Sequence, residues 1–304
     1  MLLLLAAVSF FPVSTSAAEP GKFTLTALNI PDIQRGAGLA LVLQMPSGKT
    51  WLYDTGSGYP AEEGWAGDFN AGRDLVVPFL KERGITDIAG VLMSHAHYDH
   101  FGGLVWLKDN FPIGQLIDSG YEFPGASKPD YSTELRHYSR LRAGDTLKLD
   151  DALEVEVLAP PKEFFGNPEG AVRAPNDPPA HYLVNANSLG IRIRHGGVVF
   201  YLPGDIQTED IDRSLLPFTD PAKLKCNVLI APGHGIHGSK AFAEATRPEV
   251  SIASVFPRYA RGLKSTPELK AVGAKTYITG IHGWVRVVSD GKSYTVTAEH
   301  PDAK

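Results

Sequence analysis

The chain has 304 residues, 43% of them hydrophobic, which is enough to bury a large core in one large α/β domain or in two small ones. Its formal net charge of −5 gives no global electrostatic reason to expect nucleic acid as a partner, and a polyanion would need a local basic patch. The single cysteine, Cys226, excludes an intrachain disulfide.

The N-terminal residues have the pattern of a secretory signal peptide. Residues 1–8 are apolar but too few to span a bilayer, and small residues suited to cleavage after Ala18 follow them. A basic segment before the apolar one is missing from this sequence, and a buried N-terminal element is the alternative. We expect residues 1–18 to be a signal peptide, the protein to be secreted or periplasmic, and residues 19–304 to form a single domain without a stable membrane span.

The first half of this domain is predicted to be mainly β-strand. Apolar runs and alternating patterns predict strands at 23–28, 38–44, 50–54, 88–94 and 115–118. Pro46 and Gly48 predict a tight hairpin turn between two of these strands. A helix pattern at 74–83 ends at Gly84, and a second helix is expected at 103–109.

The strand expected at 88–94 leads into His95, His97, Asp99 and His100. Imidazole nitrogen and carboxylate oxygen suit a borderline divalent ion such as zinc, whereas four such groups without an ion would repel or lose solvation. Extended spacing points His95 and His97 to one side, where they can share an ion. Asp99 and His100 lie where the chain turns into the next helix and can face a second ion about 3.5–4 Å away. The alternative is a polar loop whose histidines only form hydrogen bonds.

Strands and short helices alternate through the second half. The pattern at 131–142 is compatible with a helix, and 145–149 with 153–158 predict a hairpin. Residues 160–179 are dense in proline, glycine and asparagine, which predicts an irregular surface loop that could act as a lid. Further strands are predicted at 187–194, 198–202, 227–231, 250–255, 275–279, 284–288 and 293–298, with helices at 240–246 and after 266.

Two more aspartates follow predicted strands. Asp54 opens Asp54-Thr55-Gly56, where glycine lets the chain pass close to the histidines; a simple Asp-Gly turn is the alternative. Asp205 ends the strand at 198–202, repeating the plan of the first half. A carboxylate has two oxygens and can bridge two cations, so Asp205 stands where a two-metal site needs it.

Taken in order, these motifs resemble the competence-protein ComEC-like branch of the metallo-β-lactamase superfamily over residues 23–300. The agreeing segments are Pro46-Ser47-Gly48-Lys49, Asp54-Thr55-Gly56, Val77-Pro78-Phe79-Leu80, Gly84-Ile85, residues 94–103, Ala143-Gly144-Asp145, Leu158-Ala159-Pro160, Asn187-Ser188, Gly204-Asp205 and Ala231-Pro232-Gly233-His234-Gly235. The resemblance implies an α/β fold, the four-layer αβ/βα sandwich. In this fold two sheets face each other, helices lie outside, and metals bind at the sheet edges.

The resemblance also implies two divalent metal ions, zinc with manganese as the alternative. The implied ligands are His95 and His97 for the first ion, Asp99, His100 and His234 for the second, and Asp205 as the bridge. Asp99 is the implied catalytic residue, orienting a water molecule, and Asp54 would orient the loop that carries the histidines.

The sequence departs from the family pattern at two positions, and the second departure leaves the first ion with fewer protein ligands. The family commonly has His-His-Gly-Ser where this chain has Gly233-His234-Gly235-Ile236. The β-lactamases themselves have a histidine where this chain offers Asn187-Ser188. The candidates for the missing ligand are His181, His237 and His282, with an ordinary surface histidine as the alternative for His237.

We therefore expect a metal-dependent hydrolase of phosphodiester bonds, acting on a small-molecule or nucleic-acid substrate, with nuclease activity as the sharpest form. One alternative is a hydrolase of carbonyl substrates such as a lactone, thioester or β-lactam. The other is a binding protein with a degenerate metal site, favoured by Gly233 and Asn187.

Phosphate groups would need basic side chains near the metals, although the arginines at 136–142 also fit a solvated basic face. The candidates are Arg136, Arg140, Arg142, Arg173, Arg258, Arg261 and Lys264.

Overall fold

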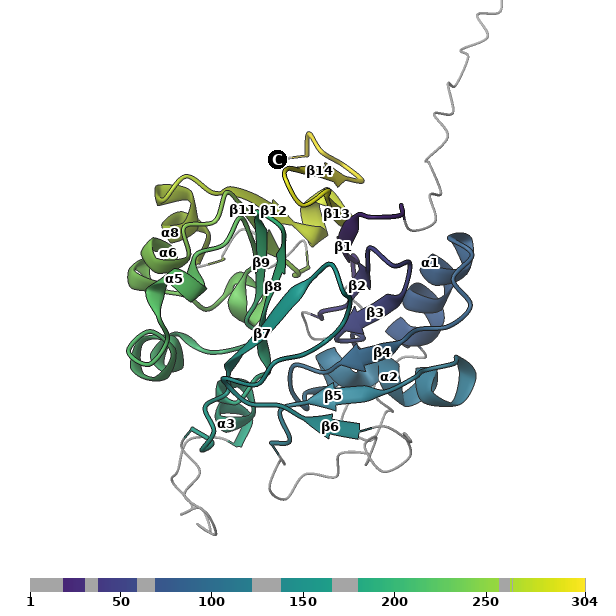
Figure 1. Cartoon of the computed structure of the whole chain (residues 1–304), viewed down its shortest axis with the longest axis horizontal. Helices are drawn as coiled ribbons and strands as arrows, with labels where there is room; N and C mark the ends of the chain where they lie inside the picture. The colour runs from purple at the N-terminus through teal and green to yellow at the C-terminus, as the bar shows by residue number, and fades with distance from the viewer. Residues whose placement is uncertain are drawn as a thin grey trace, which may run out of the picture.

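Two β-sheets lie face to face in the middle of the molecule, and helices cover their outer faces (Figure 1). The computed structural model describes residues 19–30, 38–58, 69–121, 138–165, 180–256, 263 and 265–303. The expected signal peptide and most of the expected loop at 160–179 lie outside these residues.

The first sheet has eight strands in the order β14-β13-β1-β2-β3-β4-β5-β6. The strands from β14 to β3 pair antiparallel, whereas β3, β4, β5 and β6 run parallel. Their bounds are β1 (Phe23–Ala27), β2 (Leu41–Gln44), β3 (Thr50–Tyr53), β4 (Gly90–Leu92), β5 (Leu116–Asp118), β6 (Tyr138–Arg140), β13 (Val285–Ser289) and β14 (Tyr294–Ala298).

The second sheet has six strands in the order β12-β11-β10-β9-β8-β7. Here β7, β8 and β9 pair antiparallel, and β9 to β12 run parallel. Their bounds are β7 (Glu154–Ala159), β8 (Gly190–His195), β9 (Val198–Leu202), β10 (Val228–Ile230), β11 (Val250–Ala253) and β12 (Lys275–Ile278).

The helices complete a four-layer αβ/βα sandwich, as predicted. The first sheet is covered by η2 (Gly72–Val76), α1 (Val77–Glu82) and α2 (Tyr98–Asn110). The second is covered by η3 (Ile211–Leu215), α5 (Pro221–Leu224), α6 (Lys240–Thr246) and α8 (Ser265–Ala271). Shorter elements are α3 (Ala180–Ala186), α4 (Thr208–Asp210), η4 (Pro232–Gly235) and α9 (Thr279–His282). Within the described residues, no helix has the length and apolarity to cross a membrane.

The main core lies between the sheets and is built from inward-facing side chains of both. Phe23 of β1 and Phe200 of β9, each fully buried, meet edge to face with ring centroids 4.9 Å apart. Burial of apolar area of this kind is the main stabilising term of a fold, and edge-to-face rings add to it. The strand ends are therefore held by a core that does not depend on them.

Three expected elements differ from the structure. The helix expected from residue 103 begins at Tyr98, so Asp99 and His100 lie in its first turn. Residues 138–140, expected in a helix, form β6, because their backbone pairs with β5; the rest of that expected helix, 131–137, lies outside the described residues. The segment 145–149 forms one isolated bridge, Thr146 to Glu156, instead of a full hairpin strand.

Candidate metal centre

The candidate site lies where the parallel strands of both sheets end. Asp54 follows β3, His95 follows β4, Asp205 follows β9 and His234 follows β10. Carboxyl ends of parallel strands meet at one edge of a sheet, and ligands of open α/β sheets bind outside that edge. The face-to-face packing then brings the two edges together. We call this region the carboxyl edge.

The first turn of α2 places the motif residues. His97 is extended (φ −101°, ψ 145°) and caps the helix, with its carbonyl accepting the amide protons of His100 and Phe101. Because the strand-to-helix turn is this tight, His95, His97, Asp99 and His100 all face the same edge.

Two glycines allow α2 to approach the Asp54 loop. A Cβ at Gly102 would lie 2.5 Å from the Gly58 nitrogen, and one at Gly103 would lie 2.1 Å from the Thr55 oxygen. No side chain fits at such distances, so the Gly-Gly pair is required for the helix to rest on this loop.

Four donor atoms meet on one side of the site. The His234 Nε2 atom lies 3.2 Å from Asp205 Oδ2, 3.5 Å from Asp99 Oδ2 and 3.2 Å from His100 Nε2. His100 Nε2 lies 3.3 Å from the same Asp205 oxygen. Donors around a tetrahedral zinc ion at 2.0–2.1 Å are separated by about 3.3–3.4 Å, so this spacing fits one divalent ion.

A second group of donors adjoins the first. His95 Nε2 lies 3.0 Å from His97 Nδ1, and ligand atoms of His95, His100 and Asp205 lie within 4.8 Å of one another. Asp205 thus has neighbours among the donors of both groups. We call His95, His97, Asp99, His100, Asp205 and His234 together the histidine–aspartate cluster.

Hydrogen bonds behind the cluster fix which ring nitrogens face it with a lone pair. His100 Nδ1 lies 2.7 Å from Asp54 Oδ2 and His234 Nδ1 lies 2.9 Å from the Ser254 carbonyl oxygen, and neither oxygen can donate. Both rings must therefore carry their proton on Nδ1, which leaves Nε2 free to ligate a metal.

Asp54 controls His95 through a serine. The Ser94 hydroxyl donates to Asp54 Oδ2 at 2.6 Å, so it accepts from His95 Nδ1 at 2.8 Å and leaves His95 Nε2 unprotonated. Asp54 also accepts the Ser94 amide proton at 2.7 Å and is fully buried. The structure contains the expected orienting contact of Asp54. The connection from Asp54 through Ser94 to His95 was not predicted from the sequence, although the position of Ser94 directly before His95 could have indicated it.

Electrostatics separate the histidines. Burial lowers the pKa of His100, but Asp205, Asp54 and Asp99 raise it well above its ordinary value. Burial likewise opposes the charge on His234, and Asp205 outweighs it to raise the pKa to about 9. In contrast, burial and repulsion by His100 and His97 hold the pKa of His95 well below its usual range. The carboxylates thus attract positive charge to the His100 and His234 side, where a cation can replace protons.

The carboxylates respond in the opposite direction. Burial raises the pKa of Asp205, but His234 and His100 hold it well below its ordinary value. Burial also opposes the ionised form of Asp99, and His100 and His234 keep its pKa low. Both groups are therefore ionised, and the Asp99 side chain is 21% exposed. An ionised carboxylate here can accept a hydrogen bond from an entering water.

The two departures from the family pattern have structural reasons. Asn187 is fully buried and holds the chain at Phe165, accepting from its amide at 2.8 Å and donating to its carbonyl at 3.1 Å. A Cβ at Gly233, whose φ is +51°, would lie 2.3 Å from His237 Cδ2. The ring of His237 occupies the space that a side chain at 233 would need.

Two of the three candidates for the missing ligand, His237 and His282, do not belong to the donor groups found among the described residues. His282 Nδ1 instead lies 2.9 Å from the Ile278 amide nitrogen, and His237 packs on Gly233. The His181 backbone is part of α3, and its side chain lies outside the described residues.

The basic residues proposed to seat phosphates are only partly described. Arg142 donates to the carbonyls of Ser119 and Lys162 and stacks on Phe164, 3.5 Å from the ring centroid. It is therefore a structural residue. Arg140 is exposed and packs over Gly120. The others, Arg136, Arg173, Arg258, Arg261 and Lys264, lie outside the described residues.

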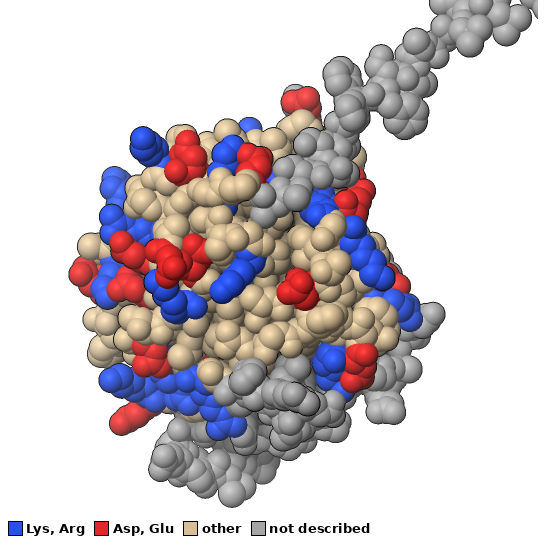
Figure 2. Space-filling model, turned by 45° about the vertical axis from the view of Figure 1, so that its right-hand side comes forward, with Lys and Arg blue, Asp and Glu red and all other residues tan. Residues whose placement is uncertain are grey.

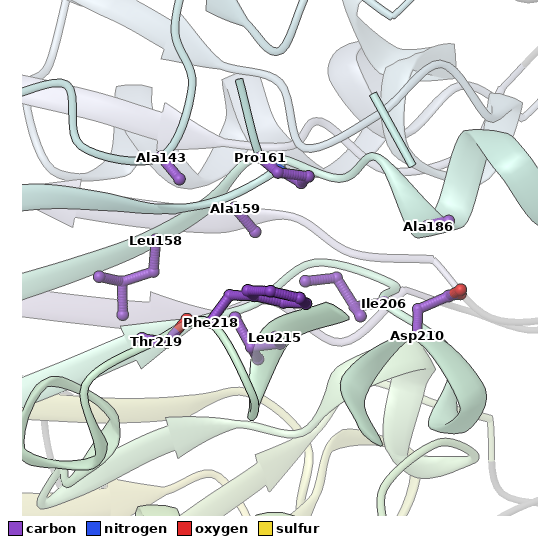
Figure 3. A pocket seen from close by; sticks show the side chains of 10 residues that line it. All are labelled: Ala143, Leu158, Ala159, Pro161, Ala186, Ile206, Asp210, Leu215, Phe218 and Thr219. Carbon is purple, nitrogen blue, oxygen red and sulfur yellow. The ribbon is translucent and has the colours of Figure 1, made fainter. Parts of the chain in front are cut away.

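A separate small cavity of about 60 Å³ lies beside Ile206, next in the chain to Asp205 (Figure 3). Asp210 is its single ionisable lining residue, and the rest of the wall is mainly apolar. The groups able to perform hydrolysis therefore lie in the histidine–aspartate cluster and not in this cavity.

Comparison with known proteins identifies the family. The sequence model of the metallo-β-lactamase superfamily matches residues 33–234, and the chain belongs to this superfamily. ComE operon protein 3 of Bacillus subtilis (strain 168) is 26% identical over 196 residues, which are 61% of this chain and 22% of that protein. Competence protein ComA of Neisseria gonorrhoeae is 25% identical over 290 residues, 93% of this chain and 34% of that protein. These matches support the expected ComEC-like branch, and the chain spans a fifth to a third of the length of these relatives.

The fold agrees with a solved structure, that of Tm1679, described as a metal-dependent hydrolase of the β-lactamase superfamily. It superposes with a TM-score of 0.50 at 14% identity, covering 84% of this chain and 95% of that one. This likeness agrees with the expected fold, and the family match confirms the expected metallo-β-lactamase superfamily.

Proposed function

We propose that the protein is an exported hydrolase of phosphodiester bonds that uses two divalent metal ions. The observation that carries the proposal is the position of Asp205, whose carboxylate lies within 4.8 Å of a His95 donor atom and within 3.3 Å of those of His100 and His234. An oxygen pair in that position suits a bridge between two cations.

We assign His95 Nε2 and His97 Nδ1 to the first ion and Asp99, His100 and His234 to the second, with Asp205 shared. Zinc is our first choice and manganese the alternative, because imidazole and carboxylate donors suit both. When bound, such ions supply Lewis-acid chemistry, lowering the pKa of water and stabilising negative charge on the substrate.

Side chains of the protein orient the water molecule and hold the metal-binding histidines in place. Asp99 is ionised and partly exposed, so we assign it the role of accepting a hydrogen bond from the attacking water and orienting it. Asp54 and the Ser254 carbonyl hold His100 and His234 with Nε2 toward the reacting atoms. The fully buried Asp54 and His100 exclude solvent behind them, which strengthens these interactions.

The substrate class rests on the ordered motifs and on the relatives, two of which are a competence protein and a ComE operon protein. On the face drawn in Figure 2, basic and acidic side chains of the described residues are largely interspersed, and the net charge of the chain is −5. Phosphates would therefore be held near the metals by few basic residues. The most specific version of the proposal is that the substrate is a nucleic acid.

The test begins with metal content and then compares substrates. Metal-loaded protein is incubated with single- and double-stranded DNA, bis-p-nitrophenyl phosphate, a lactone and a chromogenic cephalosporin at low and moderate salt. We expect the phosphodiesters to be cleaved first, and DNA cleavage to fall with salt because each phosphate contact releases counterions. Cleavage of only the lactone or cephalosporin contradicts the phosphodiester proposal. Less than one equivalent of bound transition metal contradicts hydrolysis altogether.

We also propose export, with cleavage after Ala18 and residues 19–304 as one mature domain. Peptide mass mapping of native protein should give an N-terminus near Glu19. Native protein that retains Met1 in the cytosol contradicts this proposal.

A further inference from the structure

Two ligands assigned to the second ion come from opposite halves of the molecule. Asp99 lies on α2, beside the first sheet, and His234 lies in η4, after a strand of the second sheet. Their facing atoms, Asp99 Oδ2 and His234 Nε2, are 3.5 Å apart. An ion shared by both requires the two sheets to keep a fixed separation at the carboxyl edge.

Ser254 makes contacts in both directions at this position. It follows β11 directly and is 2% exposed. Its carbonyl oxygen accepts from His234 Nδ1 at 2.9 Å, and its hydroxyl donates to the Gly38 carbonyl oxygen at 2.6 Å, 216 residues away in the chain.

The Gly38 end of this contact continues to Asp99. The Leu39 amide donates to the Asp99 carbonyl oxygen at 3.2 Å, and a Cβ at Gly38 would lie 3.3 Å from that same oxygen. The Leu39 carbonyl in turn accepts from the Gly56 amide at 2.8 Å, which ties the segment to the loop that begins at Asp54. The Gly38 carbonyl belongs to the same peptide group as the Leu39 amide, so this hydrogen bond fixes the carbonyl relative to the backbone of α2.

We infer that Ser254 is a positioning residue for the second metal ion, with its hydroxyl holding His234 at ligand distance from Asp99. The carbonyl of Ser254 fixes the protonated nitrogen of His234, and the hydroxyl fixes where that carbonyl stands relative to α2. Hydrogen bonds of this kind behind a metal ligand typically change metal affinity by about 10–100-fold when removed. This inference rests on the proposed metal site.

The test compares isosteric replacements. Ser254→Thr keeps the hydroxyl, and Ser254→Val has the same shape without it. Ser251→Ala is the matched control, because Ser251 is a fully buried serine of β11 whose hydroxyl has no hydrogen-bond partner among the described residues. Each protein is titrated with cobalt and zinc against a chelator, and the visible spectrum of the cobalt form is recorded.

We expect Ser254→Val to weaken binding of one ion by about 10–100-fold and to change the cobalt spectrum. Ser254→Thr should bind within about threefold of the parent, and Ser251→Ala should match it. Equal affinities and spectra for the Val and Thr variants contradict the inference. So does loss of the native circular dichroism in metal-free Ser254→Val, because Ser254 would then hold the fold itself. A parent chain that binds no metal contradicts the proposed function instead.

Discussion

The molecule buries histidines at two opposite ends of its sheets, and the pKa of His100 at one end is shifted in the opposite direction to that of His195 at the other. At the carboxyl edge, His100 is fully buried and its pKa is raised well above the ordinary value by Asp205, Asp54 and Asp99, against the effect of burial. At the other end, where β8 turns into β9, His195 is also buried and its pKa is lowered, chiefly because burial removes solvent. The residue type is the same and both side chains are buried, but in the described part of the chain carboxylates contact His100 and not His195.

The second end serves to hold the sheets together. His195 Nδ1 lies 3.1 Å from Ser289 Oγ, and the Gly197 amide donates to the Gly291 carbonyl at 2.7 Å. These residues, 195–197 and 289–291, form a junction between the sheets in which His195 pairs with a neutral hydroxyl. Burial alone therefore keeps a histidine neutral, whereas adjacent carboxylates create a cation site.

The largest expected effect comes from removing donors of the cluster. Asp205→Ala or His97→Ala should reduce hydrolysis by roughly three orders of magnitude or more, because the groups that hold charge at the reaction centre are lost. The fold should remain, since the core lies between the sheets. Steady-state assays and circular dichroism check both parts, and near-parent activity in either variant contradicts the metal assignment.

A smaller effect should follow from changing the acid behind the cluster. Asp54→Asn should weaken metal binding by about 10–100-fold, because an amide nitrogen in place of Oδ2 accepts from neither the Ser94 hydroxyl nor His100 Nδ1. Asp150→Asn is the matched control, since Asp150 is a buried acid that accepts from the Ser47 amide in the turn at the far end of β3. Chelator competition measures both, and equal affinities would show that burial of an acid, not its position, matters.

Helix placement can be tested with one methyl group. Gly103→Ala should destabilise the protein by about 1–3 kcal/mol and lower metal binding, because the added Cβ meets the Thr55 oxygen and α2 must move. At the other end, Gly197→Ala has only the Gly291 oxygen nearby, at 3.6 Å, and should be tolerated. Thermal unfolding compares the two, and an equally tolerated Gly103→Ala would contradict the role of the close approach.

The smallest effect concerns pH. The folded pKa of His195 is below the value of about 6.5 in an unfolded chain. Above pH 6.5 the residue is mainly neutral in both states. As pH falls below 6.5, the unfolded chain binds a proton at this residue more readily than the folded chain, so the folded state loses stability.

Replacing the imidazole should remove this loss. His195→Gln should lose less stability than the parent between pH 6.5 and 5. Denaturant unfolding of both proteins at each pH gives the difference. A difference that is constant with pH would show that His195 does not titrate between folding states.

The sequence by itself determined the fold class, most strands and the residues of the cluster. The helix at 240–246 and the apolar strands are local patterns, and the spacing of His95, His97, Asp99 and His100 after a strand is typical of metal ligands whatever the rest of the fold. Such features depend on neighbouring residues in the chain, so a single sequence contains them.

The contacts between groups that are far apart in the chain were seen only in the tertiary structure. Ser254 contacts Gly38 across 216 residues, Asn187 is used to hold Phe165, and the ring of His237 fills the space at Gly233. Residues 138–140 form a strand because their backbone pairs with β5, and this pairing outweighs the local helical pattern. These outcomes depend on packing between segments that are far apart in the chain, and local sequence patterns do not encode that packing.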